Sequence, residues 1–290
     1  MAYTSGGLIS ATDYNTLVGS NSTTAGTINY VWSTGNGQYG YGQGAVATAT
    51  SGTTVAATQW STMLNALNRC LGHQSGAGAQ LGPLNYTAGQ TITAFANVIT
   101  ANTTINTNHA SYTAQGSTTT GSNYSYNPTA TAGTTYTAYI GSRTVTFASG
   151  DAARYFFNAG GALKFVTGTV TNNDGTARST DAVSLLGLGT YTFGQAQYNA
   201  VTTSYVNAVA TSDTGTYTGN YGHLDVLSSA QNASGNGDKG AAITFGIFLY
   251  EAHAGAFNNT LNVTMNHRID IVYPETTYLT SSPWGTPTVS

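Results

Sequence analysis

The residues of this chain that could do acid–base chemistry are its ten Asp and Glu residues and its five histidines. A glycoside hydrolase needs two carboxyl groups about 5 to 9.5 Å apart, and an acid–base pair needs a carboxyl group beside a histidine. Glu251 with His253 or His267 is the combination that comes nearest to this pattern. Most other acidic residues, such as Asp174 and Asp238, stand beside Gly, Asn or Ser, where Asp favours turns. We therefore expect no catalytic pair, and we expect Glu251 to mark a strand end that reaches solvent.

Other patterns of catalysis and cofactor binding are missing from the sequence. Cys70 is the only cysteine, which excludes an intrachain disulfide and a multi-cysteine metal site. No Lys-Ser or Lys-Thr follows the glycine-rich stretch 35–44, so this stretch does not match a phosphate-binding loop. No Gly-x-Ser-x-Gly motif occurs either. We therefore expect no catalytic residue, no cofactor and no metal.

A cluster of aromatic residues is the remaining candidate for a binding site. Tyr30, Trp32, Tyr39 and Tyr41 gather in a glycine-rich segment of a chain that has 20 tyrosines. Exposed aromatic rings stack on sugars or on another subunit, because they bury a large rigid area at a low entropic cost. We expect these four residues to pack on a neighbouring subunit, and contact with a glycan is the alternative.

The composition narrows the class of protein. Charged residues make up 6% of the chain, against about 25% in an ordinary globular domain. Thr, Ser, Asn, Gly and Tyr replace them, which leaves a polar surface with little repulsion between copies, as in many assembled extracellular proteins. The seven Lys and Arg residues form no basic run, so we expect no nucleic-acid contact. No signal peptide is visible, and the most apolar run, 241–250, is too short for a bilayer, so we expect no membrane insertion.

Two helices of the first 110 residues are predicted from local signals. The first begins at Ser10, which can cap it, with Asp13 three residues on and Gly19 as a stop. A weaker apolar pattern predicts another helix over 91–108. The segment 76–83 would join this helix to the preceding one as a helical hairpin.

The clearest helix is predicted over 54–71, with Gly72 as its end. One face of it carries an apolar stripe at helical spacing. The stripe consists of Trp60, Met63, Leu64, Leu67 and Leu71. We expect this stripe to be the packing seam between copies of the chain.

Strand patterns dominate after 111–133, a polar and turn-rich segment that we expect to be a linker. In 261–273, apolar residues take one parity and polar residues the other, which indicates one buried and one solvated face. His267 lies on the apolar parity, so we expect it in the core or at a subunit interface with one hydrogen bond. The run 241–250 is apolar on both parities and predicts a central strand. Residues 253–259 would then connect it to 261–273 as a hairpin.

Further strands are predicted at 143–148 and in a second hairpin. The apolar runs 154–157 and 162–166 flank Asn-Ala-Gly-Gly, so we expect a β-hairpin there. Three of the five prolines lie in 274–290, which predicts an extended tail that packs on the surface and does not pair in a sheet.

The predicted fold class is mainly β with an N-terminal helical region: an antiparallel β-sandwich-like body preceded by two or three α-helices. The predicted parts are a helical attachment and oligomerisation region (1–110), a linker (111–133), a β domain (134–273) and an extended tail (274–290).

Three short segments stand in one order along the sequence: Leu8–Asn15, Ala57–Trp60 leading to His73-Gln74, and Arg154–Gly161. Together they resemble a group of structural and tail-fibre proteins of marine and cyanobacterial phages. The resemblance covers the first half of the chain well and the rest more loosely. It implies a role in the virion and carries no catalytic residue.

We therefore expect a homo-oligomeric phage appendage protein, located in the virion, whose partners are its own copies and other phage structural proteins. A trimer is implied by the resemblance alone. Loops of the β domain could contact host surface glycans. A capsid-decorating or neck protein without receptor binding is the first alternative. A capsular-polysaccharide depolymerase and a cellular adhesin are the others.

Overall fold

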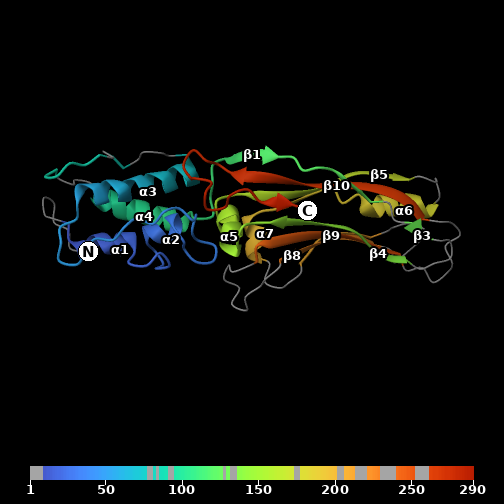
Figure 1. Ribbon diagram of the computed structural model, residues 1–290, viewed down its shortest axis with the longest axis horizontal. Coiled ribbons are helices and arrows are strands. Elements are labelled where there is room, and N and C mark those ends of the chain that lie inside the picture. The colour runs from blue at the N-terminus through green and yellow to red at the C-terminus, as the bar shows by residue number, and fades with distance from the viewer. Residues whose placement is uncertain are drawn as a thin grey trace.

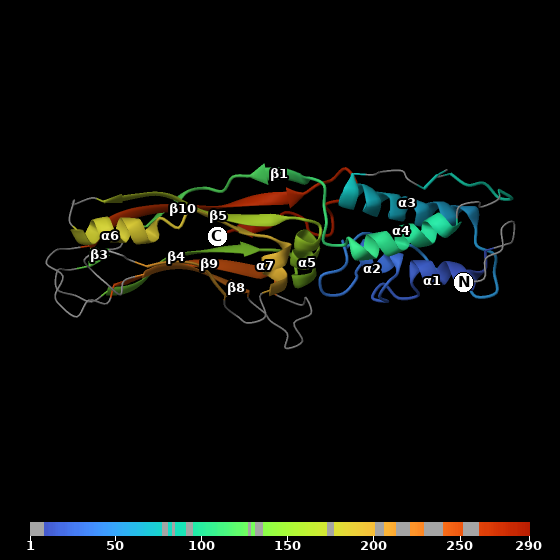
Figure 2. The ribbon, with the colours of Figure 1, turned by 180° about the vertical axis from the view of Figure 1, so that it is seen from behind.

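The molecule is elongated, with helices at one end and strands at the other (Figure 1), and the view from behind shows the same division (Figure 2). This computed structural model describes the following parts of the 290-residue chain: 9–76, 81–82, 85–90, 95–126, 129–130, 136–172, 177–200, 206–212, 221–228, 240–251 and 261–290. All structural statements below concern these residues.

Four helices form the N-terminal end: α1 (Ala11–Val18), α2 (Ile28–Trp32), α3 (Ala57–Ser75) and α4 (Phe95–Thr107). The predicted start of α1 is confirmed, because the hydroxyl of Ser10 accepts a hydrogen bond from the backbone N–H of Asp13. The predicted end of α3 at Gly72 is wrong: the helix continues to Ser75, and Gly76, whose φ of +71° suits a glycine, caps it. Gly72 serves packing instead, since a Cβ there would overlap the ring of Tyr278.

Side-chain amides hold the irregular backbone of this end. Four of them each donate to the carbonyl of one residue and accept from the N–H of that same residue, at 2.8 to 3.1 Å. These reciprocal amide pairs are Asn15 with Ala49, Asn29 with Val46, Asn68 with Leu81 and Gln43 with Thr280. Each pair satisfies one backbone N–H and one backbone carbonyl that have no strand or helix partner. The segment between α2 and α3 therefore keeps its backbone hydrogen-bonded at Val46 and Ala49 without regular structure.

The strands form two antiparallel sheets. The first has the order β1-β10-β5-β6, with β2 and β3 also along β10, and the second has the order β11-β4-β9-β8-β7. The first sheet contains β1 (Gln115–Thr119), β2 (Tyr124–Tyr126), β3 (Thr129–Ala130), β5 (Ala162–Asn172), β6 (Thr190–Phe193) and β10 (Leu261–Pro274). The second contains β4 (Tyr136–Thr146), β7 (Val206–Ser212), β8 (Tyr221–Ser228), β9 (Ala242–Glu251) and β11 (Thr288–Val289).

The predicted class, a helical N-terminal region followed by an antiparallel β body, is confirmed. The β body also contains helices that were not predicted. Phe165 of β5 stacks on Phe245 of β9 at 5.7 Å between ring centroids, so the two sheets touch through aromatic rings. Two further helices, α6 (Ala177–Leu186) and α7 (Gln195–Ala200), pack on the strands. The sandwich itself stays a prediction.

The predicted strand over 154–157 is wrong, because these residues belong to helix α5 (Gly150–Asn158). The hydroxyl of Ser149 caps the helix by accepting from the N–H of Ala152, a start signal that the strand prediction overlooked. Its apolar residues recur one turn apart and make one buried face. α5 lies between the N-terminal helices and the near ends of the strands (Figure 1). Of the predicted hairpin, only the second arm, β5, is a strand.

Three predicted connections also need correction. The segment 111–133 is no free linker, because β1, β2 and β3 lie in it and all pair with β10. β9 is central in its sheet as predicted, but β9 and β10 belong to different sheets, so they form no hairpin. Residues 252–260 themselves lie outside the described residues.

The tail after β10 was predicted not to pair in a sheet, and this is wrong. Its strand β11 pairs with β4, and the tail buries Leu279 and Trp284.

Candidate functional site

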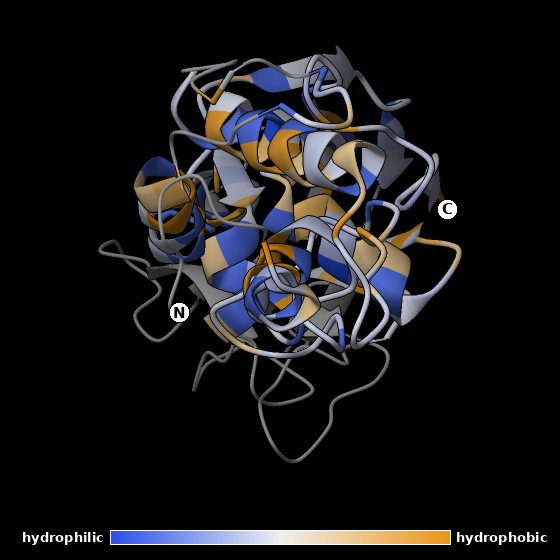
Figure 3. Ribbon diagram, turned by 90° about the vertical axis from the view of Figure 1, so that its left-hand side faces the viewer, coloured by the Kyte–Doolittle hydropathy of each residue, from blue (hydrophilic) through white to orange (hydrophobic). Residues whose placement is uncertain are grey.

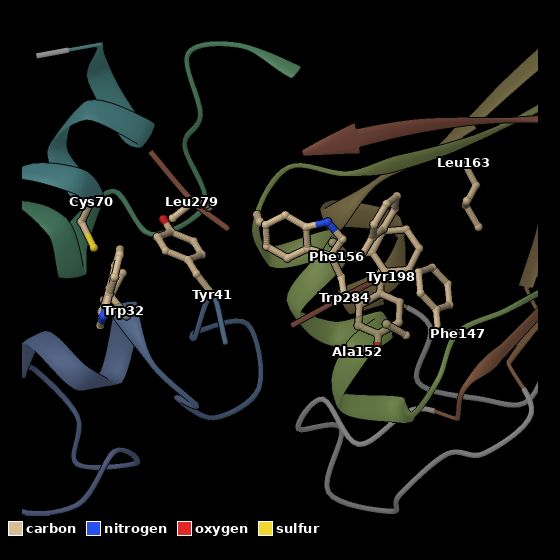
Figure 4. Packing of buried hydrophobic residues seen from close by; sticks show 14 of the residues in the cluster. Trp32, Tyr41, Cys70, Phe147, Ala152, Phe156, Leu163, Tyr198, Leu279 and Trp284 are labelled. Carbon is tan, nitrogen blue, oxygen red and sulfur yellow. The ribbon is translucent and has the colours of Figure 1, made fainter. Parts of the chain in front are cut away.

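The predicted aromatic cluster divides into buried and half-buried rings. Trp32 and Tyr41 are 6% and 1% exposed. The indole N–H of Trp32 donates to the carbonyl of Gly44 at 2.8 Å, and the hydroxyl of Tyr41 donates to the carbonyl of His109 at 3.0 Å. Burial raises the pKa of the Tyr41 hydroxyl, beside the buried Cys70 thiol. A surface contact to a subunit or a glycan therefore does not fit these two rings, which serve the core (Figure 4).

The other two rings form a stack at the surface. Tyr30 stacks on Tyr39 at 4.4 Å between centroids, and Tyr39 stacks on His109 at 3.7 Å. Burial lowers the pKa of His109, although the hydrogen bond between its Nδ1 and the carbonyl of Asn106 acts in the opposite direction. The predicted contact to a subunit or a glycan stays a prediction for Tyr30 and Tyr39 alone.

The apolar stripe of α3 is used inside the chain. Its side chains are between 0 and 7% exposed, and they are Trp60, Met63, Leu64, Leu67 and Leu71. Trp60 stacks on Phe95 of α4 at 5.9 Å. The stripe therefore has no exposed area left for a second copy in this arrangement, and a seam between copies must use another surface.

The outer face of α4 is partly exposed to solvent; it is formed by Ile99, Thr100, Thr103, Thr104, Thr107 and Asn108. Each of the four threonine hydroxyls donates to the carbonyl four residues earlier in the same helix, at 2.9 to 3.1 Å. The hydroxyls are thus turned toward the backbone, which leaves the methyl groups at the surface. The face also lines a shallow hollow of about 340 Å³. Viewed from the helical end, hydrophobic and hydrophilic residues alternate along the helices (Figure 3).

Arg154 and Asn158 join the helical end to the β body. Arg154 of α5 is 3% exposed and donates to the carbonyls of Thr34 and Tyr39 at 2.9 and 2.8 Å. One turn later, the amide of Asn158 donates to Tyr39 at 2.9 Å. Gly40 has a φ of +93°, and a Cβ there would overlap the backbone of Thr34, so this loop approaches α5 only with glycine. The residues 154–161 that carry the resemblance thus form a structural joint.

A buried histidine and glutamate lie at the same joint. Nδ1 of His73 is 2.8 Å from a carboxylate oxygen of Glu275, and the backbone N–H groups of Thr277 and Tyr278 donate to the other oxygen. Burial alone would raise the pKa of Glu275, but the hydrogen bonds from His73, Tyr278 and Thr277 hold it below its ordinary value. Tyr41 contacts the imidazole edge-on at 4.9 Å.

His73, Glu275 and the nearby Cys70 resemble a catalytic triad in residue type but not in accessibility. His73 and Cys70 are 0% exposed, and Glu275 is 6% exposed. Burial raises the pKa of the Cys70 thiol, which keeps it protonated and unreactive. No solute reaches these groups in this arrangement, and their effect is to fasten the tail to α3.

His267 is in the core, as predicted, but lacks the predicted hydrogen bond. It is 0% exposed, and neither ring nitrogen has a partner among the described residues. Its imidazole stacks on Phe165 at 5.6 Å and lies against Gly141 of β4, where a Cβ would come within 2.9 Å of the ring. Burial, with a smaller contribution from Arg143, lowers the pKa of His267 to about 4. Glu251 is the last residue of β9. Its side chain and the whole of His253 lie outside the described residues, so the expectation that they form no catalytic pair stays untested.

Residues that sequence reasoning missed are mainly polar and buried. The sequence placed Arg154 in a strand, Asn158 in a turn and Glu275 in the tail. Each of these side chains is less than 9% exposed. The Ser149 cap could have revealed the helix that carries Arg154 and Asn158; no local signal marks Glu275. Within the described ranges, no three His, Cys, Asp or Glu side chains form a group that could hold a metal ion, and no helix could span a membrane.

Comparisons with known proteins identify no relative of this chain: no family model, no curated protein and no solved structure matches it.

Proposed function

We propose that this chain is a structural component of a bacteriophage particle, a tail fibre or similar appendage, which assembles with copies of itself through its helical end. The proposal joins the sequence resemblance to one observation that carries it: the helical end combines a buried, hydrogen-bonded interior with an outer surface that is almost free of charge. Such a surface is suited to lie against another uncharged surface, because no ion must lose its water.

The distribution of charge supports self-association. Asp13 and Arg69 are the only charged residues before Arg143. A second copy brings an equally uncharged helical end, so the two surfaces match without desolvating an ion pair. The outer face of α4 adds methyl groups, since its threonine hydroxyls are bonded to the helix itself. We assign the contact between copies to this face.

Light scattering coupled to size-exclusion chromatography tests the assembly. The wild-type chain should elute as an oligomer at micromolar concentration. The double variant Thr103→Glu with Thr107→Glu places two carboxylates on the face, and we expect its dissociation constant to rise by at least about tenfold. Circular dichroism and thermal unfolding of the variant should match the wild type, because both threonines are exposed.

Thr62→Glu is the matched control. Thr62 is an exposed threonine on α3, and its hydroxyl makes the same bond to the carbonyl four residues earlier, at 2.9 Å. This variant should remain oligomeric. A wild-type monomer at micromolar concentration would overturn the proposed self-assembly, and equal dissociation of both variants would move the contact off the α4 face.

The location of the chain tests the virion role directly. Gold-labelled antibody against the chain should decorate an appendage of intact particles in electron micrographs. Label on the capsid shell would favour the decorating protein over the appendage. A chain found only in the soluble fraction of infected cells would contradict both.

A further inference from the structure

A cleft of about 320 Å³ opens where β1, the end of β10 and the C-terminal tail meet. Hydroxyl-bearing side chains line it: Ser117, Tyr273, Thr276, Ser281, Ser282 and Thr286. We propose that this cleft binds a neutral saccharide, a contact that rests on the proposed function because it would give the appendage its host-surface ligand. The cleft differs from the aromatic cluster of Tyr30, Trp32, Tyr39 and Tyr41, and it is built from residues that the sequence did not single out.

Four hydroxyl groups of the cleft are free to bond a ligand, whereas that of Ser282 contacts the hydroxyl of Thr280 at 3.4 Å. Those of Ser117, Thr276, Ser281 and Thr286 make no hydrogen bond to another described residue. This contrasts with the α4 face, where every threonine hydroxyl is bonded to its own helix. Each free hydroxyl is both a donor and an acceptor, the combination that a sugar hydroxyl also offers. Several of them around one hollow can bond several sugar hydroxyls at once.

The absence of charge in the lining selects a neutral ligand. None of the side chains that line the cleft is ionisable near neutral pH. Glu275 follows Pro274 in the sequence, but its carboxylate is buried and engaged by His73 and by the N–H groups of Thr277 and Tyr278. An anionic saccharide would find no cation in the lining to pair with, and a cationic ligand would find no carboxylate there.

Two aromatic residues line the cleft, and only Tyr273 offers exposed apolar surface to a ligand. Tyr273 is half-buried, and its ring meets that of Phe156 of α5 edge-on at 6.0 Å, which fixes its position from behind. Trp284 is 1% exposed and lies beside Phe156 (Figure 4). A sugar ring can lay its C–H face on the exposed part of Tyr273 while its hydroxyls bond the surrounding Ser and Thr.

The walls are held in place before any ligand arrives. A Cβ at Gly116 would lie 2.5 Å from the carbonyl oxygen of Pro274, so glycine allows β1 to approach the end of β10. The backbone N–H groups of Trp284 and Gly285 donate to the carbonyl of Ser281, which closes a turn on the opposite wall. The reciprocal pair of Gln43 with Thr280 anchors the tail to the helical end. A preformed site avoids the ordering cost that weakens binding.

Ligand-detected saturation-transfer NMR on the full chain tests the proposal. The probes are the neutral oligosaccharides maltohexaose, cellohexaose and mannohexaose, with the acidic hexagalacturonate as a charged comparison. We expect transfer to at least one neutral probe and none to hexagalacturonate. Thr286→Phe fills the cleft and should weaken binding at least about tenfold. Thr277→Phe is the matched control, because Thr277 is an exposed threonine of the same tail outside the lining, and it should bind as the wild type does.

Three results would overturn the site: no transfer to any neutral probe, equal binding by Thr286→Phe and the wild type, or preference for hexagalacturonate. Light scattering on the same samples separates this failure from that of the proposed function. An oligomer that binds no saccharide refutes only the cleft, and a monomeric wild type refutes the assembly whether or not the cleft binds.

Discussion

In the helical end, irregular backbone is bonded by side-chain amides, whereas in the β body backbone groups bond one another across long antiparallel strands. Asn29 and Asn68 each satisfy an N–H and a carbonyl of one residue far along the chain. β4 and β9, by contrast, pair directly over most of their length. Neutral polar side chains thus stabilise the helical end where ion pairs often serve in other proteins, and Asp13 and Arg69 are its only Asp, Glu, Lys or Arg residues.

The difference predicts where substitution costs most, and the largest effect should come from Asn29→Leu. Asn29 is 2% exposed, and its removal leaves the N–H and carbonyl of Val46 without partners. We expect a loss of about 2 to 4 kcal/mol in the free energy of unfolding, measured by urea denaturation. Asn97→Leu, at an exposed position of α4, is the control and should stay within about 0.5 kcal/mol. A loss that small for Asn29→Leu would mean that the amide pairs do not hold this end.

A pH effect in the β body should come next in size. The pKa of His267 is about 4 in the folded chain, against 6.5 for an ordinary histidine. Between these values the unfolded chain binds more protons, so the free energy of unfolding falls as the pH drops from 6.5 toward 4. The loss should be on the order of 2 kcal/mol.

His267→Phe removes this titration while keeping an aromatic ring against Phe165. Urea denaturation at several pH values between 7 and 4 should therefore show a shallower decline for the variant. The slope that remains belongs partly to His109, whose pKa is also lowered. An unchanged slope would show that His267 is not the group responsible.

The smallest effect should come from the ion pair on α5. Asp151 lies 2.8 Å from Arg154, but the side chain of Asp151 is 56% exposed. Asp151→Asn should cost less than about 1 kcal/mol in thermal or urea unfolding, because water screens an exposed pair. A larger loss would mean that charge, and not the carbonyls of Thr34 and Tyr39, positions Arg154 at the joint.

Periodic segments were predictable from the sequence. The stripe of α3, the alternation of β10 and the apolar run of β9 each repeat one environment over many residues, so local pattern matches burial. α5 was predicted as a strand because four adjacent bulky residues hide a helical period unless the cap at Ser149 is noticed. β1, β2 and β3 all pair with β10, and the residues of β1 and β2 are exposed or half-buried, so no apolar alternation marks these two strands in the sequence.

The candidate sites were less predictable than the fold. In the aromatic cluster, Trp32 and Tyr41 are buried whereas Tyr30 and Tyr39 are half-buried. The sequence around the four residues is similar and does not predict this difference. The cleft joins Ser117 to Thr286, residues far apart in sequence, and neither belongs to a motif. Contacts of this kind depend on topology, which local periodicity does not encode.

The bond between Gln43 and Thr280 spans 237 residues. During synthesis at about 5 to 20 residues per second, the helical end therefore leaves the ribosome roughly 10 to 50 seconds before the segment that fastens it. Through that interval His73 lacks its contact with Glu275, and the backbone of Thr280 cannot yet bond Gln43. The joint closes only when the tail has been made, so a chain that ends before residue 280 lacks the bond to Gln43.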